Sequence, residues 1–142
     1  MGVVKLCDFG SATTEQKAPD DSWSAAQRTK LEEDFHRHTT PMYRAPEILD
    51  TYLNYPVGPL QDVWAAGCVL FYLCYRTHPF EDSAKLRIIY AKYAIPPDDQ
   101  RYVPFRPLIE CSLRPDPRER PSAADLLERI GALAAALQGA FD

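Results

Sequence analysis

An uninterrupted apolar stretch in the middle of the chain places the strongest limit on its fold. From Val63 to Cys74 no residue carries a charge, and Asp62 stands immediately before the stretch. A helix that is apolar on all sides is normally buried in a core, whereas a surface helix has one polar face. The stretch is too short to cross a bilayer, which takes about 20 residues. We therefore expect a buried helix at the centre of a globular fold, and no transmembrane segment.

The rest of the chain is predicted to be mainly α-helical, with a short β element at the N-terminus. Val3–Cys7 contains adjacent valines and leads into a turn, which is typical of a strand. The spacing of apolar residues predicts further helices over residues 23–35, 47–55, 83–94, 103–113 and from Ser122 onward. The last helix has one apolar stripe, formed by Leu126, Leu127, Ile130, Leu133 and Leu137.

Charge and cysteine usage exclude several classes of function. The net charge is −4, so the chain has no basic excess that would favour nucleic acid or an anionic membrane. No C-x-x-C pair is present among Cys7, Cys68, Cys74 and Cys111, so a zinc site is not expected. We interpret the cysteines as reduced thiols of a cytosolic or nuclear protein. The N-terminus lacks a basic stretch followed by an apolar run, so we expect no signal peptide.

The first candidate for chemistry is the tripeptide Asp8-Phe9-Gly10. Phosphoryl transfer needs a carboxylate that holds Mg²⁺ against phosphate oxygens, because the metal neutralises charge in the transition state. A glycine after that carboxylate allows the backbone to turn sharply. On its own, however, the tripeptide is better interpreted as a turn at the end of a strand.

Four further motifs follow in a fixed order. They are Ala45-Pro46-Glu47, Asp62-x-Trp64-x-x-Gly67, His78-Pro79-Phe80 and Asp116-Pro117-x-x-Arg120-Pro121-Ser122. Together with residues 8–10 the series resembles the eukaryotic serine/threonine protein kinases over nearly the whole chain. The resemblance implies a truncated C-terminal (large) lobe of the kinase fold. Residues 1–138 would be a partial kinase domain, 8–47 its activation segment, and 139–142 a tail.

The resemblance assigns catalytic and docking roles. Asp8 would be the magnesium ligand, and Cys7, Asp8, Phe9 and Gly10 would line the nucleotide site; a buried strand thiol is an equal alternative for Cys7. Thr40, Pro41 and Tyr43 would form the substrate-docking segment, with Thr40 favouring serine and threonine substrates.

Four other residues would hold the fold. Glu47 and Arg120 would form a buried ion pair that anchors the activation segment, because a planar guanidinium suits a carboxylate in two-point contact. Asp62 and Trp64 would belong to the scaffold. The sequence does not choose a regulatory phosphorylation site among Thr13, Thr14, Thr29 and Thr39.

Within the kinases, the stretches 5–13, 39–44 and 78–82 are most similar to the Numb-associated kinase family, in particular to its branch with cyclin G-associated kinase. The long activation segment fits that family. Membership implies phosphorylation of threonine in clathrin-adaptor subunits during vesicle traffic. It also implies a cytoplasmic location with peripheral association at vesicle or Golgi membranes.

Several parts of a working kinase are absent from the 142 residues. The chain contains no Gly-x-Gly-x-x-Gly, no His-Arg-Asp and no lysine in a Val-Ala-Ile-Lys context. ATP and Mg²⁺ are the cofactors of the intact kinase, but we expect neither to bind this chain tightly. We therefore predict that the chain alone is inactive and that its open apolar face favours self-association. The alternative is a non-catalytic interaction module that retains the substrate-docking face.

Overall fold

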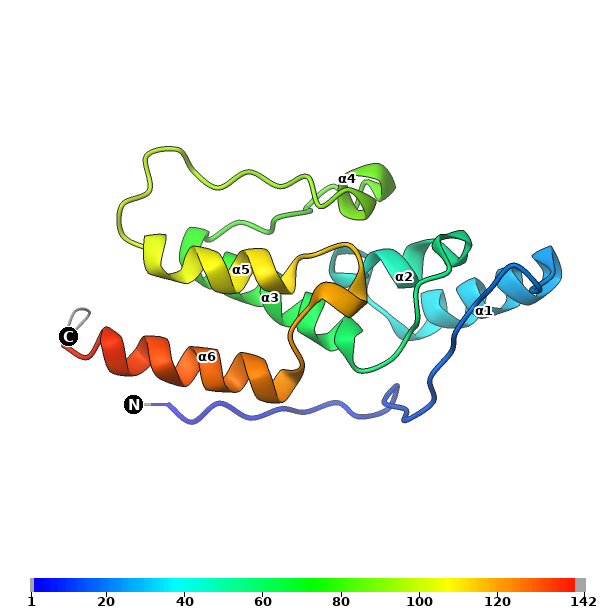
Figure 1. Cartoon of the computed structure of the whole chain (residues 1–142), viewed down its shortest axis with the longest axis horizontal. Helices are drawn as coiled ribbons and strands as arrows, with labels where there is room; N and C mark the ends of the chain where they lie inside the picture. Colours follow the sequence, from blue (N-terminus) through cyan, green and yellow to red (C-terminus); the bar gives the residue numbers. More distant parts are fainter. Residues whose placement is uncertain (1, 140–142) are drawn as a thin grey trace.

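The helix predicted from the apolar stretch, α3 (Leu60–Tyr75), is the centre of the computed structural model, which describes residues 2–139. In Figure 1, α3 runs beside α5, with α1 and α2 toward one end and α4 on the side away from α6. In the view of Figure 1, the extended N-terminal segment is drawn below α6, on the side away from α4. The mainly helical fold of a kinase C-terminal lobe, predicted from the sequence, is confirmed.

The remaining elements are short helices joined by irregular segments. The α-helices are α1 (Ala25–His38), α2 (Pro46–Leu49), α4 (Lys85–Ile89), α5 (Arg106–Ser112) and α6 (Ala123–Ala136). The 3₁₀ helices are η1 (Pro41–Tyr43), η2 (Thr51–Leu53), η3 (Val103–Phe105) and η4 (Pro117–Glu119). No helix within residues 2–139 is long and apolar enough to span a membrane.

One face of α3 forms the main core. Trp64, Cys68 and Phe71 are almost fully buried, and Trp64 stacks on Phe80 with ring centroids 5.5 Å apart. Gly67 lies where α3 meets α5: a Cβ placed on it would come within 2.7 Å of the Ser112 Cβ. The close approach of these two helices therefore depends on the missing side chain of Gly67.

The opposite face of α3 is not covered, which corrects the prediction of burial on all sides. Val69 is 46% exposed, Tyr72 46% and Leu73 59%. Their apolar character matches a buried environment, but no element among residues 2–139 packs over them. This exposed α3 face (Val69, Tyr72 and Leu73) is the open apolar surface that was expected of a partial lobe.

The strand predicted over Val3–Cys7 is wrong for this structure. The segment is an unpaired extended chain, in which Val4 is 97% and Leu6 84% exposed. A strand needs a neighbour that supplies hydrogen-bond partners, and no described segment pairs with residues 3–7. The β pairing recorded in the structure is one isolated bridge between Lys17 and Val57.

Helix starts were predicted better than helix lengths. Ser24 caps α1 in a capping box with Gln27, and Ser122 caps α6 by accepting from the Asp125 N–H. The 47–55 prediction splits into α2 and η2, because Asp50 is extended and its side chain caps the second helix.

Burial of the predicted α6 stripe is also limited. Leu126 is buried, whereas Leu127 is 71% and Ile130 43% exposed. Residues 140–142 of the predicted tail lie outside the described residues.

Candidate functional site

The predicted docking segment forms η1, between α1 and α2. Pro41 occupies the first turn, where its missing N–H costs nothing, and the Tyr43 N–H donates to the Thr40 carbonyl at 3.1 Å. Thr40 and Pro41 are exposed, while Tyr43 is half-buried. The segment therefore has a solvent-facing start and an anchored end.

Tyr43 is anchored against His78. The two rings meet edge to face, with centroids 4.8 Å apart and planes at 86°. His78 is buried, and its Nδ1 accepts the Phe80 N–H at 3.0 Å. Burial lowers the pKa of the His78 imidazole, and the carboxylate of Glu81 opposes this shift without reversing it. The His78 imidazole, which burial keeps neutral, thus packs against the docking segment through Tyr43. The sequence had indicated His78 only as part of a turn motif.

A buried ion pair fixes the chain immediately after the docking segment. Arg120 donates from both terminal nitrogens to Glu47, at 2.7 and 2.9 Å, and both side chains are 0% exposed. The guanidinium also lies over the Trp64 ring, 5.1 Å from its centroid. Its other hydrogen bonds go to the backbone carbonyls of Leu60, Arg114 and Pro115. One arginine therefore connects α2, the start of α3 and the entry to η4, and its contact with the Glu47 carboxylate is the two-point contact that a planar guanidinium favours.

A second buried arginine, which the sequence did not single out, holds α1 in place. Arg28 is 4% exposed and donates to the carbonyls of Thr51 and Asp20 and to the side chain of Asn54. Four residues further along α1, Glu32 accepts both the N–H and the hydroxyl of Thr51, at 3.0 and 3.1 Å. These contacts join the helix inside the predicted activation segment to η2. Arg28 lies in a charged, mostly exposed helix, so no pattern in the sequence distinguishes it from a surface residue.

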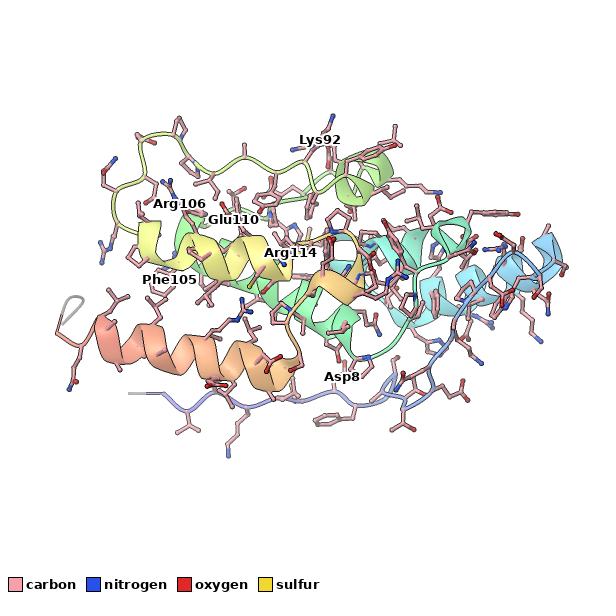
Figure 2. The ribbon with its side chains drawn as sticks, viewed as in Figure 1. Asp8, Lys92, Phe105, Arg106, Glu110 and Arg114 are labelled. Carbon is pink, nitrogen blue, oxygen red and sulfur yellow. The ribbon has the colours of Figure 1, made fainter. Side chains whose placement is uncertain are left out.

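Asp8 lies on the extended N-terminal segment, as Figure 2 shows. It is exposed, and its own φ is 66°, in the left-handed region. The turn expected at Gly10 is present: Gly10 and Ser11 are turn residues, and the Ala12 N–H donates to the Phe9 carbonyl at 3.1 Å. Aspartate tolerates the left-handed region better than most side chains, so Asp8 can redirect the backbone immediately before this turn.

The neighbours of Asp8 are also exposed. Phe9 is 63% exposed, and the thiol of Cys7 is open to solvent, so the alternative of a buried thiol is wrong. The described residues contain no group of three or more histidine, cysteine or acidic side chains that could hold a metal. Asp8 can supply one carboxylate, but Mg²⁺ needs near-octahedral oxygen coordination. Within residues 2–139, Asp8 is therefore not part of a preformed cluster of metal-binding side chains.

An open cleft of about 1180 Å³ brings several predicted residues together. Among the predicted site residues, Cys7, Gly10, Thr40, Tyr43 and Asp62 line it. Asp8, Phe9 and Pro41 are not among the lining residues. Asp62 is in the first turn of α3, its N–H donates to the Pro59 carbonyl at 3.1 Å, and its carboxylate makes no hydrogen bond with the described residues. Residues assigned to the nucleotide side and to the docking side thus border one space.

Comparison with known proteins gives a consistent picture. The family described as "Protein kinase domain" matches residues 1–130. A probable serine/threonine-protein kinase of Dictyostelium discoideum is 39% identical over 132 residues, which is 93% of this chain and 12% of that protein. Actin-regulating kinase 1 of Saccharomyces cerevisiae is 37% identical over 126 residues, 89% of this chain and 19% of that protein. Actin-regulating kinase PRK1 of the same yeast is 33% identical over 132 residues, 93% of this chain and 16% of that protein. The chain thus spans less than one fifth of the length of these relatives.

Proposed function

Because the chain belongs to the protein kinase family, we propose that it is the substrate-docking part of a serine/threonine kinase, which transfers phosphate from ATP to protein hydroxyl groups. The observation that carries the proposal is the arrangement around η1. Its exposed Thr40 faces the cleft, Tyr43 rests on His78, and the Glu47–Arg120 pair fixes the next residues. A rigidly supported segment at the edge of an open cleft suits recognition of an extended peptide.

The individual roles follow the predicted ones. Asp8 is the magnesium ligand of the intact kinase, and Cys7, Phe9 and Gly10 lie on the nucleotide side. Thr40, Pro41 and Tyr43 contact the peptide that carries the acceptor hydroxyl. Glu47, Trp64 and Arg120 hold the segment in place, and Asp62 is the scaffold residue that accepts backbone N–H groups of the catalytic loop in the intact kinase. We further propose that residues 8–47 are the activation segment and that the kinase unit extends to residue 138.

This chain alone is proposed to be inactive. Its 142 residues lack the glycine-rich loop, the lysine and the catalytic loop that position ATP and the attacking hydroxyl. We expect no transfer of labelled phosphate from ATP to a threonine peptide by the purified chain, and no tight binding of ATP or Mg²⁺. Detectable transfer above a no-enzyme control would contradict the proposal.

The finer assignment is to the Numb-associated kinases, with clathrin-adaptor subunits as substrates and a cytoplasmic site of action at vesicle or Golgi membranes. The stretches 5–13, 39–44 and 78–82 support this assignment. Two of the similar yeast proteins are named as actin-regulating kinases, so proteins of the actin machinery are the competing substrate class. Phosphorylation of purified adaptor subunits and of actin-associated proteins by the intact kinase would distinguish these classes.

The second candidate function is a non-catalytic module that binds kinase partners or adaptor peptides through η1. The docking segment and its supports are ordered within this chain, which favours this alternative if the short protein occurs in cells.

Sequencing the source transcript upstream of the Met1 codon distinguishes the two candidates. An in-frame extension that encodes His-Arg-Asp and a third-strand lysine would establish the kinase reading, and an in-frame stop would favour the module. In the extended protein, Asp8→Asn should abolish phosphate transfer, because it removes the metal ligand. Asp98→Asn, which changes another exposed aspartate, is the matched control and should retain activity. Full activity of the Asp8→Asn protein would refute the role of Asp8.

A further inference from the structure

The backbone just before Arg120 supplies two of the three carbonyls that bind its guanidinium. The Arg120 Nε donates to the Arg114 carbonyl at 2.7 Å, and the Nη2 donates to the Pro115 carbonyl at 3.0 Å. The other hydrogen bonds of the guanidinium go to the Glu47 carboxylate and to the Leu60 carbonyl. A guanidinium has five N–H donors, so each of them has an acceptor in this site.

The two ends of the loop 114–119, which carries these carbonyls, are tied together by the side chain of Arg114. In Figure 2, Arg114 lies where α5 ends and the chain turns toward η4. Its Nη1 donates to the Glu119 carbonyl at 2.8 Å. Within the loop, the Asp116 carboxylate accepts the Arg118 N–H at 2.9 Å and pairs with the Arg118 guanidinium at 2.8 Å. That contact shapes the middle of the loop, whereas Arg114 joins its first residue to its last.

Arg114 is exposed, but the guanidinium that its loop holds is completely buried. A single hydrogen bond at the surface adds little to the free energy of unfolding. Its effect here is on geometry, because a planar guanidinium takes its orientation from the acceptors placed around it. If the loop opened, the Arg120 Nε would lose its acceptor in a buried site, where an unpaired donor is unfavourable. The guanidinium would then turn toward another acceptor, and its two-point contact with Glu47 would be disturbed.

Glu47 passes this orientation on to the docking segment. It lies in the first turn of α2, which begins at Pro46, and η1 ends only four residues before Glu47. The connection is short and hydrogen-bonded: the Arg44 N–H donates to the Pro41 carbonyl at 3.2 Å. A displacement of the Glu47 carboxylate would therefore be transmitted to η1 rather than absorbed by a flexible linker.

We propose that Arg114 is a positioning residue for the docking segment. By closing the loop before Arg120 it fixes the two carbonyls that orient this arginine, and through Glu47 it fixes the place of η1. The sequence motif that names Arg120 begins at Asp116 and does not include Arg114. The consequence for peptide recognition rests on the proposed function; the orientation of Arg120 does not.

The orientation of Arg120 is tested in the whole chain, labelled with ¹⁵N-arginine, by the rate at which its Nε–H exchanges with solvent in NMR. Arg114→Ala should raise this rate by about tenfold or more, because opening of the loop leaves the Nε–H unprotected. Arg114→Lys should restore most of the protection, since one ammonium donor suffices for one carbonyl. The matched control is Arg87→Ala: Arg87 is also exposed, and its Nε donates to the Lys92 carbonyl at 3.3 Å across a turn of the same length. Unchanged exchange in Arg114→Ala, no recovery in Arg114→Lys, or equal acceleration in the control would overturn the proposal.

The effect on docking is tested in a protein extended upstream to include the catalytic loop. Arg114→Ala should raise the KM for a threonine peptide several-fold, with kcat and the KM for ATP unchanged, because only the binding of the peptide is weakened. A general loss of folded protein would lower kcat instead. An unchanged KM for the peptide would overturn the role of Arg114 in placing the docking segment. Absence of transfer by the unsubstituted extended protein would contradict the proposed function, and the exchange rate of Arg120 would then decide the role of Arg114 by itself.

Discussion

Gly67→Ala tests the close contact between α3 and α5 that organises the core. In an ordinary helix interior, alanine is more favourable than glycine by about 1 kcal/mol. At position 67, however, the new methyl group would lie 2.7 Å from the Ser112 Cβ and 3.0 Å from the Leu113 Cδ2. Ser112 is 1% and Leu113 2% exposed, so neither can move into solvent. The Ser112 Cβ is attached directly to the backbone, and relief of the clash requires α3 and α5 to separate.

The matched control is Gly131→Ala in α6. It makes the same substitution inside a helix, but a Cβ at this position would meet no atom within 4 Å. Gly131→Ala should therefore stabilise the chain by about 1 kcal/mol. Gly67→Ala should gain the same helix-propensity contribution to stability, but overpacking should lower the stability by about 1–3 kcal/mol. The difference between the two variants isolates the contact, and we expect about 2 kcal/mol.

Urea unfolding followed by circular dichroism measures this difference. With a urea slope of about 2 kcal/mol/M, the midpoints of the two variants should differ by about 1 M, with Gly67→Ala the lower. Slopes that agree between the variants would show that only stability has changed. If both variants gained stability equally, the inferred contact between Gly67 and Ser112 would be refuted.

Three other predictions concern the supports of the candidate site and the uncovered face. Glu47→Gln should lower the free energy of unfolding by about 3–5 kcal/mol, because it leaves the Arg120 charge buried without a charged partner. The double variant Glu47→Leu, Arg120→Met should recover part of this loss. An unchanged melting temperature of the Glu47→Gln chain would contradict the role of the pair. His78 has a pKa below its ordinary 6.5 in the folded chain, so the unfolded chain binds more protons, and stability should fall as the pH drops from about 6.5 toward the folded pKa. His78→Phe should flatten that part of a stability–pH curve, and an unaltered slope would show that another group titrates there. Because of the exposed α3 face, the purified chain should bind ANS and self-associate in sedimentation velocity, and Leu73→Ser should reduce both effects. A sharply melting monomer that does not bind ANS would show that this face does not cause self-association.

The sequence was sufficient for the parts of the fold that depend on local or strongly patterned signals. The apolar stretch located α3, and Ser122, the predicted start of the last helix, caps α6 because side-chain capping is local. Glu47 and Arg120 were paired through their motifs, and they lie in two-point contact. These features need no knowledge of distant neighbours or arise from motifs specific to the family.

The remaining features depend on what lies next to a residue in space. Val3–Cys7 has strand composition but finds no pairing partner among residues 2–139, so it stays extended and unpaired. The outer face of α3 is apolar but uncovered for the same reason. Arg28 is buried only because segments near residues 20, 51 and 54 fold back onto α1. The left-handed backbone of Asp8 is a local feature that composition does not determine.

The ion pair between Glu47 and Arg120 also has a consequence for the order of events during synthesis. Its partners are separated by 73 positions, and the arginine is the C-terminal one. Closing so long a loop carries an entropic cost that must be met before the contact stabilises anything. On a ribosome, residues 40–47 leave the exit tunnel well before Arg120 is made, so Glu47 stays exposed to solvent until then. The docking segment should therefore be among the last parts of the chain to become fixed, and a pause in translation before residue 120 would leave it unanchored.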